Sequence, residues 1–175
     1  MINKSNKINI NMLNRTLQII RKNDDINPIM KNVNNDIIFK CFNNRNLFLK
    51  ITKKDYFHIG EGYRTGRSLI QNYKYAFTWY SRAKNYYNKS NFYIGEDYLL
   101  GLSRDANIKM AKIHFKKIIN NKSIYYIGWI KLIEEVRKPL DKRDYKGVHK
   151  LFVQSFEKGY EAAIKEVTMM EHYIK

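Results

Sequence analysis

The apolar residues in the C-terminal two-thirds of the chain recur at helical spacing. Over residues 76–83, 92–99 and 111–118 they are separated by three or four positions, which places them on one face of a helix. Polar and charged residues fill the remaining positions. This pattern predicts a series of amphipathic helices.

Two sets of markers show that these helices belong to an internal repeat. The first set consists of Ile-Gly steps that end at Gly60, Gly95 and Gly128, spaced 35 and 33 residues apart. The second set lies between them and consists of Ala76, Ala111 and Val148, spaced 35 and 37 residues apart. Because both sets share one period, the sequence indicates repeated units of two helices each.

The small residue at each marker position predicts close packing. Glycine inside a helix costs up to about 1 kcal/mol relative to alanine, so its recurrence at one repeat position needs a compensating contact. We expect Gly95, and likewise Ala111, to let the neighbouring helix approach and seat a large aromatic side chain.

The repeat resembles the SEL-one-like (Sel1-like) family, a helix pair similar to the tetratricopeptide repeat but slightly longer. The family's unit reads roughly Ala-x-Tyr-x-Leu-Gly-x-x-Tyr-x-x-Gly, a loop, then Asp-x-x-x-Ala-x-x-Trp-Tyr-x-x-Ala-Ala. Residues 90–101, a loop that holds Asp105, and residues 108–115 follow it closely. The stretch 75–83 matches the second helix best. The third unit has a longer loop at 134–144 and lacks the second glycine.

The resemblance implies an all-α fold, an α/α solenoid with the shape of a right-handed superhelix. We expect about three helix pairs, at 55–89, 90–121 and 122–159, and a terminal half repeat from Tyr160 in which Lys165 replaces the glycine. The predicted regions are a basic, Asn-rich arm (1–35) with a short helix at about 11–22, a divergent capping helix region (36–54) and the repeat domain (55–175). A short strand pair is the lesser alternative for 36–54.

The net charge of +17, from 33 Lys+Arg against 16 Asp+Glu, allows two explanations. A polyanionic partner such as RNA is one. The other is a genome rich in A and T, because Lys outnumbers Arg by 24 to 9. The single cysteine, Cys41, fits a reducing compartment, and also an oxidising one without disulfide bridges. We expect a cytoplasmic location. The acid-free segment before Asp24 makes mitochondria the alternative.

The sequence shows no catalytic constellation. His58 and His114 lie on the packing faces of predicted helices, and the glycine-rich stretch 60–66 follows a helix rather than the strand that a phosphate-binding loop requires. The longest uncharged run, 123–130, is too short for a bilayer. We therefore expect no enzyme activity, cofactor, metal or membrane span, and no small-molecule substrate.

The resemblance implies a protein–protein interaction scaffold or adaptor. The residues that we predict to line its protein-binding groove are Tyr56, Glu61, Arg64, Asn91, Glu96, Tyr125 and Trp129. The alternative is a basic structural subunit of a ribonucleoprotein or other large assembly, contacting RNA or acidic protein. Its predicted polyanion contacts are Lys109, Lys112, Lys116 and Lys117.

Overall fold

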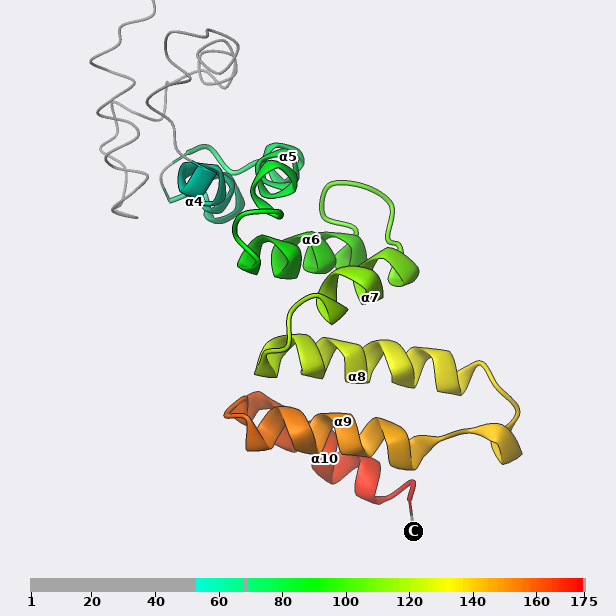
Figure 1. The fold of residues 1–175 in the computed structure, drawn as a ribbon. Helices are drawn as coiled ribbons and strands as arrows, with labels where there is room; N and C mark the ends of the chain where they lie inside the picture. The colour runs from blue at the N-terminus through cyan, green and yellow to red at the C-terminus, as the bar shows by residue number, and fades with distance from the viewer. Residues whose placement is uncertain (1–52, 68, 175) are drawn as a thin grey trace, which may run out of the picture. The chain divides into compact units, whose positions relative to one another are not determined.

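The computed structural model describes residues 53–67 and 69–174, and every regular element in them is a helix (Figure 1). The chain divides into two compact units, residues 1–90 and 91–175, which are described separately. The helices are α4 (Lys53–Thr65), α5 (Tyr73–Ala83), α6 (Lys89–Leu100), α7 (Ile108–Lys116), α8 (Asn121–Val136), α9 (Tyr145–Glu157) and α10 (Ile164–Glu171), with short 3₁₀ turns η3 (Leu140–Lys142) and η4 (Glu161–Ala163). The predicted all-α fold of helix pairs with a terminal half repeat is confirmed.

Each marker glycine receives an aromatic ring from the second helix of its pair. A Cβ atom added at Gly95 would lie 2.9 Å from the Phe115 ring, closer than real side chains approach. The other two contacts have the same 2.9 Å separation, Gly60 against Tyr80 and Gly128 against Phe152. All three rings are at most 2% exposed. The packing role that the sequence predicts for the glycine is therefore confirmed in all three pairs.

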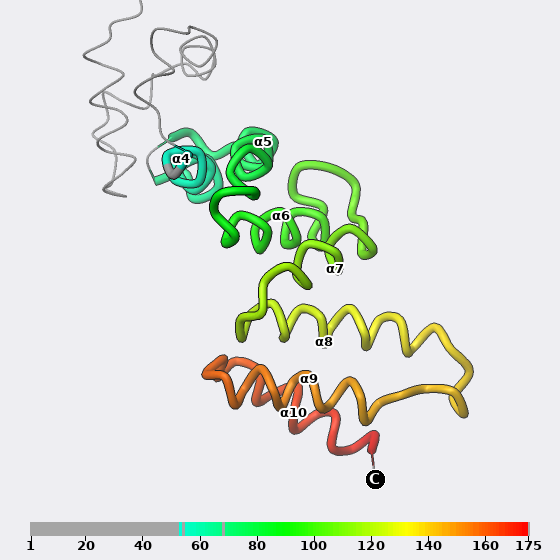
Figure 2. Tube along the Cα trace, in the orientation of Figure 1, coloured from blue at the N-terminus to red at the C-terminus, as the bar shows by residue number. Residues whose placement is uncertain are grey.

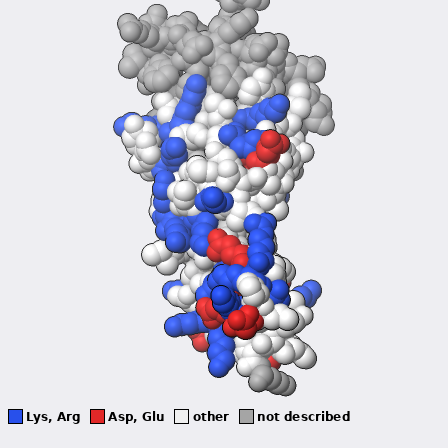
Figure 3. Space-filling view, turned by 90° about the vertical axis from the view of Figure 1, so that its right-hand side faces the viewer, with Lys and Arg blue, Asp and Glu red and all other residues white. Residues whose placement is uncertain are grey.

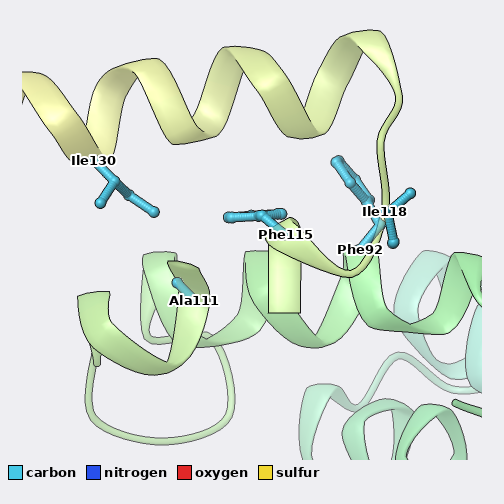
Figure 4. Packing of buried hydrophobic residues seen from close by; sticks show 5 residues of the cluster. All are labelled: Phe92, Ala111, Phe115, Ile118 and Ile130. Atoms are coloured by element: carbon cyan, nitrogen blue, oxygen red, sulfur yellow. The ribbon is translucent and has the colours of Figure 1, made fainter. Parts of the chain in front are cut away.

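In residues 91–175 the rings join into cores that run from one helix pair to the next. Figure 4 shows one cluster, which contains Phe92 of α6, Phe115 of α7 and Ile130 of α8. A second cluster holds Phe152 of α9 against Met170 of α10. Figure 2 traces the path, with α9 returning antiparallel beside α8. Within this unit, α7, α8 and α9 therefore each pack on both the helix before and the helix after them.

The second helix of each pair begins at a side-chain cap four residues before the marker Ala or Val. The caps Asn72, Asn107 and Asp144 accept backbone N–H groups at 3.1, 3.0 and 2.8 Å. They satisfy donors that a helix start leaves unpaired. By the family's Asp-x-x-x-Ala spacing, its Asp position corresponds to the cap Asn107 in the second pair, and Asp105 lies in the loop before this cap.

The first helix of the third pair ends differently from those of the other two pairs, because this pair lacks the glycine that follows the first helix. Gly66 and Gly101 follow α4 and α6 with φ of +72° and +66°, a conformation that stops a helix and that glycine adopts without strain. The equivalent position in the third pair is Glu134, and α8 continues to Val136. The added turn carries Glu134 and Glu135. The carboxylate of Glu135 accepts the backbone N–H of Asp144 at 2.9 Å.

The predictions for the arm (1–35), its helix at about 11–22, Cys41 and most of the capping region (36–54) lie outside the described residues. Residues 53 and 54 belong to α4.

We predict that Gly95→Ala destabilises the protein by about 1–3 kcal/mol, because the new methyl group would overpack against Phe115. Helix propensity alone would stabilise it by up to about 1 kcal/mol, so the sign separates the two effects. Urea unfolding of the full chain measures the change. Adding Phe115→Leu should recover part of the loss in a double-mutant cycle. A more stable Gly95→Ala variant would contradict the packing role.

A second prediction concerns acid stability. The backbone N–H of Asp144, followed by the ammonium of Lys138, lowers the pKa of Glu135 below its ordinary value. This stabilisation is present above pH about 4.5 and is lost as the pH falls through the lowered pKa. Glu135→Gln should therefore reduce the urea midpoint at pH 7 and converge with the wild type in acid. The matched control is Glu157→Gln, an exposed carboxylate on α9. An equal deficit at every pH would contradict this explanation.

Candidate protein-interaction surface

A carboxylate follows the marker position in three of the four repeats, and each accepts a tyrosine hydroxyl. The Tyr80 hydroxyl donates to Glu61 at 3.0 Å, and the Tyr126 hydroxyl donates to Glu96 at 3.4 Å. The third bond joins Tyr125 to Glu166, at 2.9 Å. Each of these hydrogen bonds links two different helices. The carboxylates thus serve as hydrogen-bond acceptors between helices.

In residues 53–90, the predicted groove residues Glu61 and Arg64 lie together on α4. An Arg64 guanidinium nitrogen lies 2.6 Å from Glu61, whose other oxygen accepts the Tyr80 hydroxyl. Tyr56, also on α4, packs its ring 6.0 Å from that of Trp79. All three predicted residues are half-buried. The polar groups of Glu61 and Arg64 are oriented by contacts within the helix pair.

In residues 91–175, Tyr125 and Trp129 lie one turn apart on α8, with ring centroids 6.5 Å apart. Phe152 packs behind both rings. Glu166 of α10 completes the group through Oε1, which accepts the Tyr125 hydroxyl. Its Oε2 is buried and has no hydrogen-bond partner. We call Tyr125, Trp129 and Glu166 the α8–α10 surface. It offers half-buried aromatic faces beside the Glu166 carboxylate.

The two remaining groove residues lie on α6 and have different surroundings. Glu96 is half-buried and accepts from Tyr126. Burial first, and then the Glu96 charge, raise the pKa of Tyr126 to about 12, so this hydroxyl stays a donor at neutral pH. Asn91 is only 4% exposed, and its side-chain oxygen lies 3.0 Å from Nδ1 of buried His114. Of the predicted groove residues in this unit, Asn91 presents the least surface to a partner.

The predicted polyanion contacts lie on α7 and just after it, but they are not equivalent. Lys112 forms an ion pair with Glu134 of α8 at 2.6 Å, so a partner would have to compete for its charge. Lys109, Lys116 and Lys117 are exposed. On the face in Figure 3, Lys and Arg cover more of the surface than Asp and Glu.

Sequence reasoning missed Tyr126 and Glu166, although a signal for Glu166 was present. Glu166 follows Lys165, the residue that replaces the marker glycine, just as Glu61 and Glu96 follow theirs. Extending the repeat register into the half repeat would have identified it. Tyr126 has no such signal, because the equivalent positions hold His58 and Tyr93.

The described part of the chain contains no cluster of three or more His, Cys, Asp or Glu placed to bind a metal ion. His114 lies in the core, stacked on Tyr98 at 5.8 Å, as its packing position predicts. The glycine-rich stretch 60–66 forms the end of α4 and the turn after it. Among the described helices, none has the length and hydropathy needed to cross a bilayer.

No family model matches the sequence, and no curated protein matches it. Among solved structures, the chain is similar to a Sel1 repeat protein from Oxalobacter formigenes, with a TM-score of 0.60 and 16% sequence identity. The match covers 90% of this chain and 59% of that one, so the chain spans less than two-thirds of its length. At this identity the likeness shows the fold alone. The predicted resemblance to Sel1-like repeats is thereby confirmed at the level of structure.

We predict that Tyr126→Phe flattens the alkaline loss of stability. With a pKa of about 12 in the folded state and about 10 when unfolded, Tyr126 contributes stability that is complete below pH 10 and lost between pH 10 and 12. Urea midpoints measured across this interval should fall less steeply in the variant. Tyr173→Phe, at a position 61% exposed, is the matched control. Identical slopes for the wild type and Tyr126→Phe would contradict the assignment.

Proposed function

We propose that the protein is a non-catalytic scaffold that binds protein partners through its helix pairs. Arrays of this kind present extended surfaces, because each repeat packs only on its neighbours and leaves its outer faces available. The likeness to a Sel1 repeat protein supports the architecture on which this proposal rests.

The observation that carries the proposal is the α8–α10 surface. Half-buried Tyr and Trp side chains are typical of the residues that dominate binding energy at protein interfaces. Their positions are fixed by Phe152 and by the hydrogen bond to Glu166, which reduces the entropy lost on binding. Glu166 adds a half-buried carboxylate beside the two rings. The surface therefore suits a peptide segment that brings an apolar side chain to the rings and a Lys or Arg head group toward this charge.

A basic structural subunit of a ribonucleoprotein or other large assembly is the second candidate. The net charge of +17 favours it, as do the exposed lysines Lys109, Lys116 and Lys117. The ion pair between Lys112 and Glu134 weakens it, because this pair neutralises one of the four predicted contacts.

The test is a pull-down from host lysate with the purified full chain, after nuclease treatment and at moderate salt, with bound proteins identified by mass spectrometry. A scaffold should retain a defined protein under these conditions. Glu166→Gln removes the charge while keeping an acceptor for Tyr125, and it should weaken retention by about tenfold, the range of a charged hydrogen bond.

Glu171→Gln is the matched control, because Glu171 is an exposed carboxylate at the end of the same helix. It should leave retention unchanged. Loss of all bound protein after nuclease or salt treatment would favour the second candidate. Equal retention by both variants would remove the α8–α10 surface from the proposal.

A further inference from the structure

The positive charge is distributed unevenly between the two units, because the acidic residues are distributed unevenly. Residues 1–90 contain 17 Lys+Arg and residues 91–175 contain 16, so the basic residues are shared almost equally between the two units. The same segments contain 5 and 11 Asp+Glu, which gives net charges of +12 and +5. A genome rich in A and T would explain a high lysine content in both units. It does not explain the depletion of acidic residues from one unit.

The two carboxylates among residues 53–90 are also turned inward. Asp55 is 3% exposed. The Glu61 side chain is 14% exposed and is held by Arg64 and the Tyr80 hydroxyl. The outer surface of the described residues in this unit therefore presents basic side chains with almost no carboxylate between them. Such a surface attracts polyanions.

The turn between α5 and α6 presents a tyrosine on this surface. Two adjacent backbone N–H groups, those of Tyr86 and Tyr87, donate to the Ala83 carbonyl at 2.9 and 2.8 Å. The Tyr87 ring packs 4.4 Å from that of buried Phe57, which anchors the turn. Its neighbour Tyr86 is 57% exposed. One tyrosine thus fixes the turn and the other is displayed to solvent.

One lysine lies over the displayed ring, and a second lies over the phenylalanine ring that anchors the turn. The ammonium of Lys53 lies 4.1 Å from the centre of the Tyr86 ring, and that of Lys89 lies 5.7 Å from the centre of the Phe57 ring. Both lysines are exposed. Cations over one face of an aromatic ring leave the other face for a planar partner.

We propose that Tyr86, with Lys53 and Lys89, forms a binding site for single-stranded nucleic acid. A base stacks on the Tyr86 ring, and the two lysines bind the adjoining phosphates. Sequence-independent sites for single strands combine these two elements, an aromatic platform and a basic surface. An acidic protein segment would engage the lysines but would gain no stacking on the tyrosine. This site lies on a different unit from the α8–α10 surface and does not rest on the scaffold function.

The experiment measures fluorescence anisotropy of a labelled oligothymidylate or oligouridylate of about 16 nucleotides with the purified full chain. The wild type should bind at low salt. Tyr86→Ala should weaken binding by about fivefold or more, whereas Tyr86→Phe, which keeps the ring, should bind like the wild type. Replacing Lys53 and Lys89 together by Gln should reduce the slope of log affinity against log salt by about 1.4.

Matched variants control for general effects on charge and folding. Tyr173→Ala removes an equally exposed tyrosine, 61% exposed, from the other unit and should have no effect. Lys150→Gln combined with Lys158→Gln removes two exposed lysines of α9 and its C-terminal turn and should leave the salt slope closer to that of the wild type. Circular dichroism confirms that each variant is folded.

Three results would overturn the proposal. They are absence of binding by the wild type, equal losses in Tyr86→Ala and Tyr173→Ala, and displacement of the oligonucleotide by polyglutamate as effectively as by unlabelled oligonucleotide. The last would identify an acidic polypeptide as the better ligand. Because the assay contains only purified protein and oligonucleotide, its failure leaves the pull-down result on Glu166 unaffected.

Discussion

The contact on which each helix pair depends is an aromatic ring seated against the backbone of the neighbouring helix at a glycine. Truncating a buried phenylalanine to alanine typically costs about 3–5 kcal/mol, whereas glycine inside a helix costs about 1 kcal/mol. The packing term is the larger, so a glycine that weakens its own helix still stabilises the pair. Phe115 shows why the effect spreads, because the same ring that covers Gly95 also stacks on Tyr126 of α8 at 5.2 Å.

The third helix pair shows how one missing glycine changes a repeat. Without a residue that adopts positive φ after the marker, α8 continues past the point where α4 and α6 stop. Its extra turn supplies Glu134 to Lys112 and Glu135 to the Asp144 backbone. In the first two pairs the corresponding cap N–H donates to a tyrosine carbonyl instead. A longer helix thus replaces a backbone contact with a charged one, and it pairs one of the four predicted polyanion contacts, Lys112, with a carboxylate.

The sequence predicted the features that depend on local rules. The period, the helix pairs and the role of Gly95 follow from residue spacing and from the small size of glycine. The contacts of Tyr126 and Glu166 do not follow, because a hydrogen bond between two helices depends on their separation and on side-chain rotamers. Asn91 illustrates the same limit. Its polarity suggested a surface residue, and only the fold shows that it meets His114 inside the core.

The pairing of carboxylates with tyrosines has a consequence for surface charge. One carboxylate oxygen of Glu61, Glu96 and Glu166 accepts a hydrogen bond from a tyrosine hydroxyl of another helix. Carboxylates held in this way stabilise contacts between helices and are less available to balance the lysines around them. In residues 91–175 other acidic residues provide that balance, through ion pairs such as those of Lys112 and Lys131. Among residues 53–90 Glu61 provides such balance, to Arg64, and Asp55 is buried. The carboxylate at the repeat position that supports the fold is therefore largely enclosed, and the described surface of residues 53–90 is left with few exposed acidic groups.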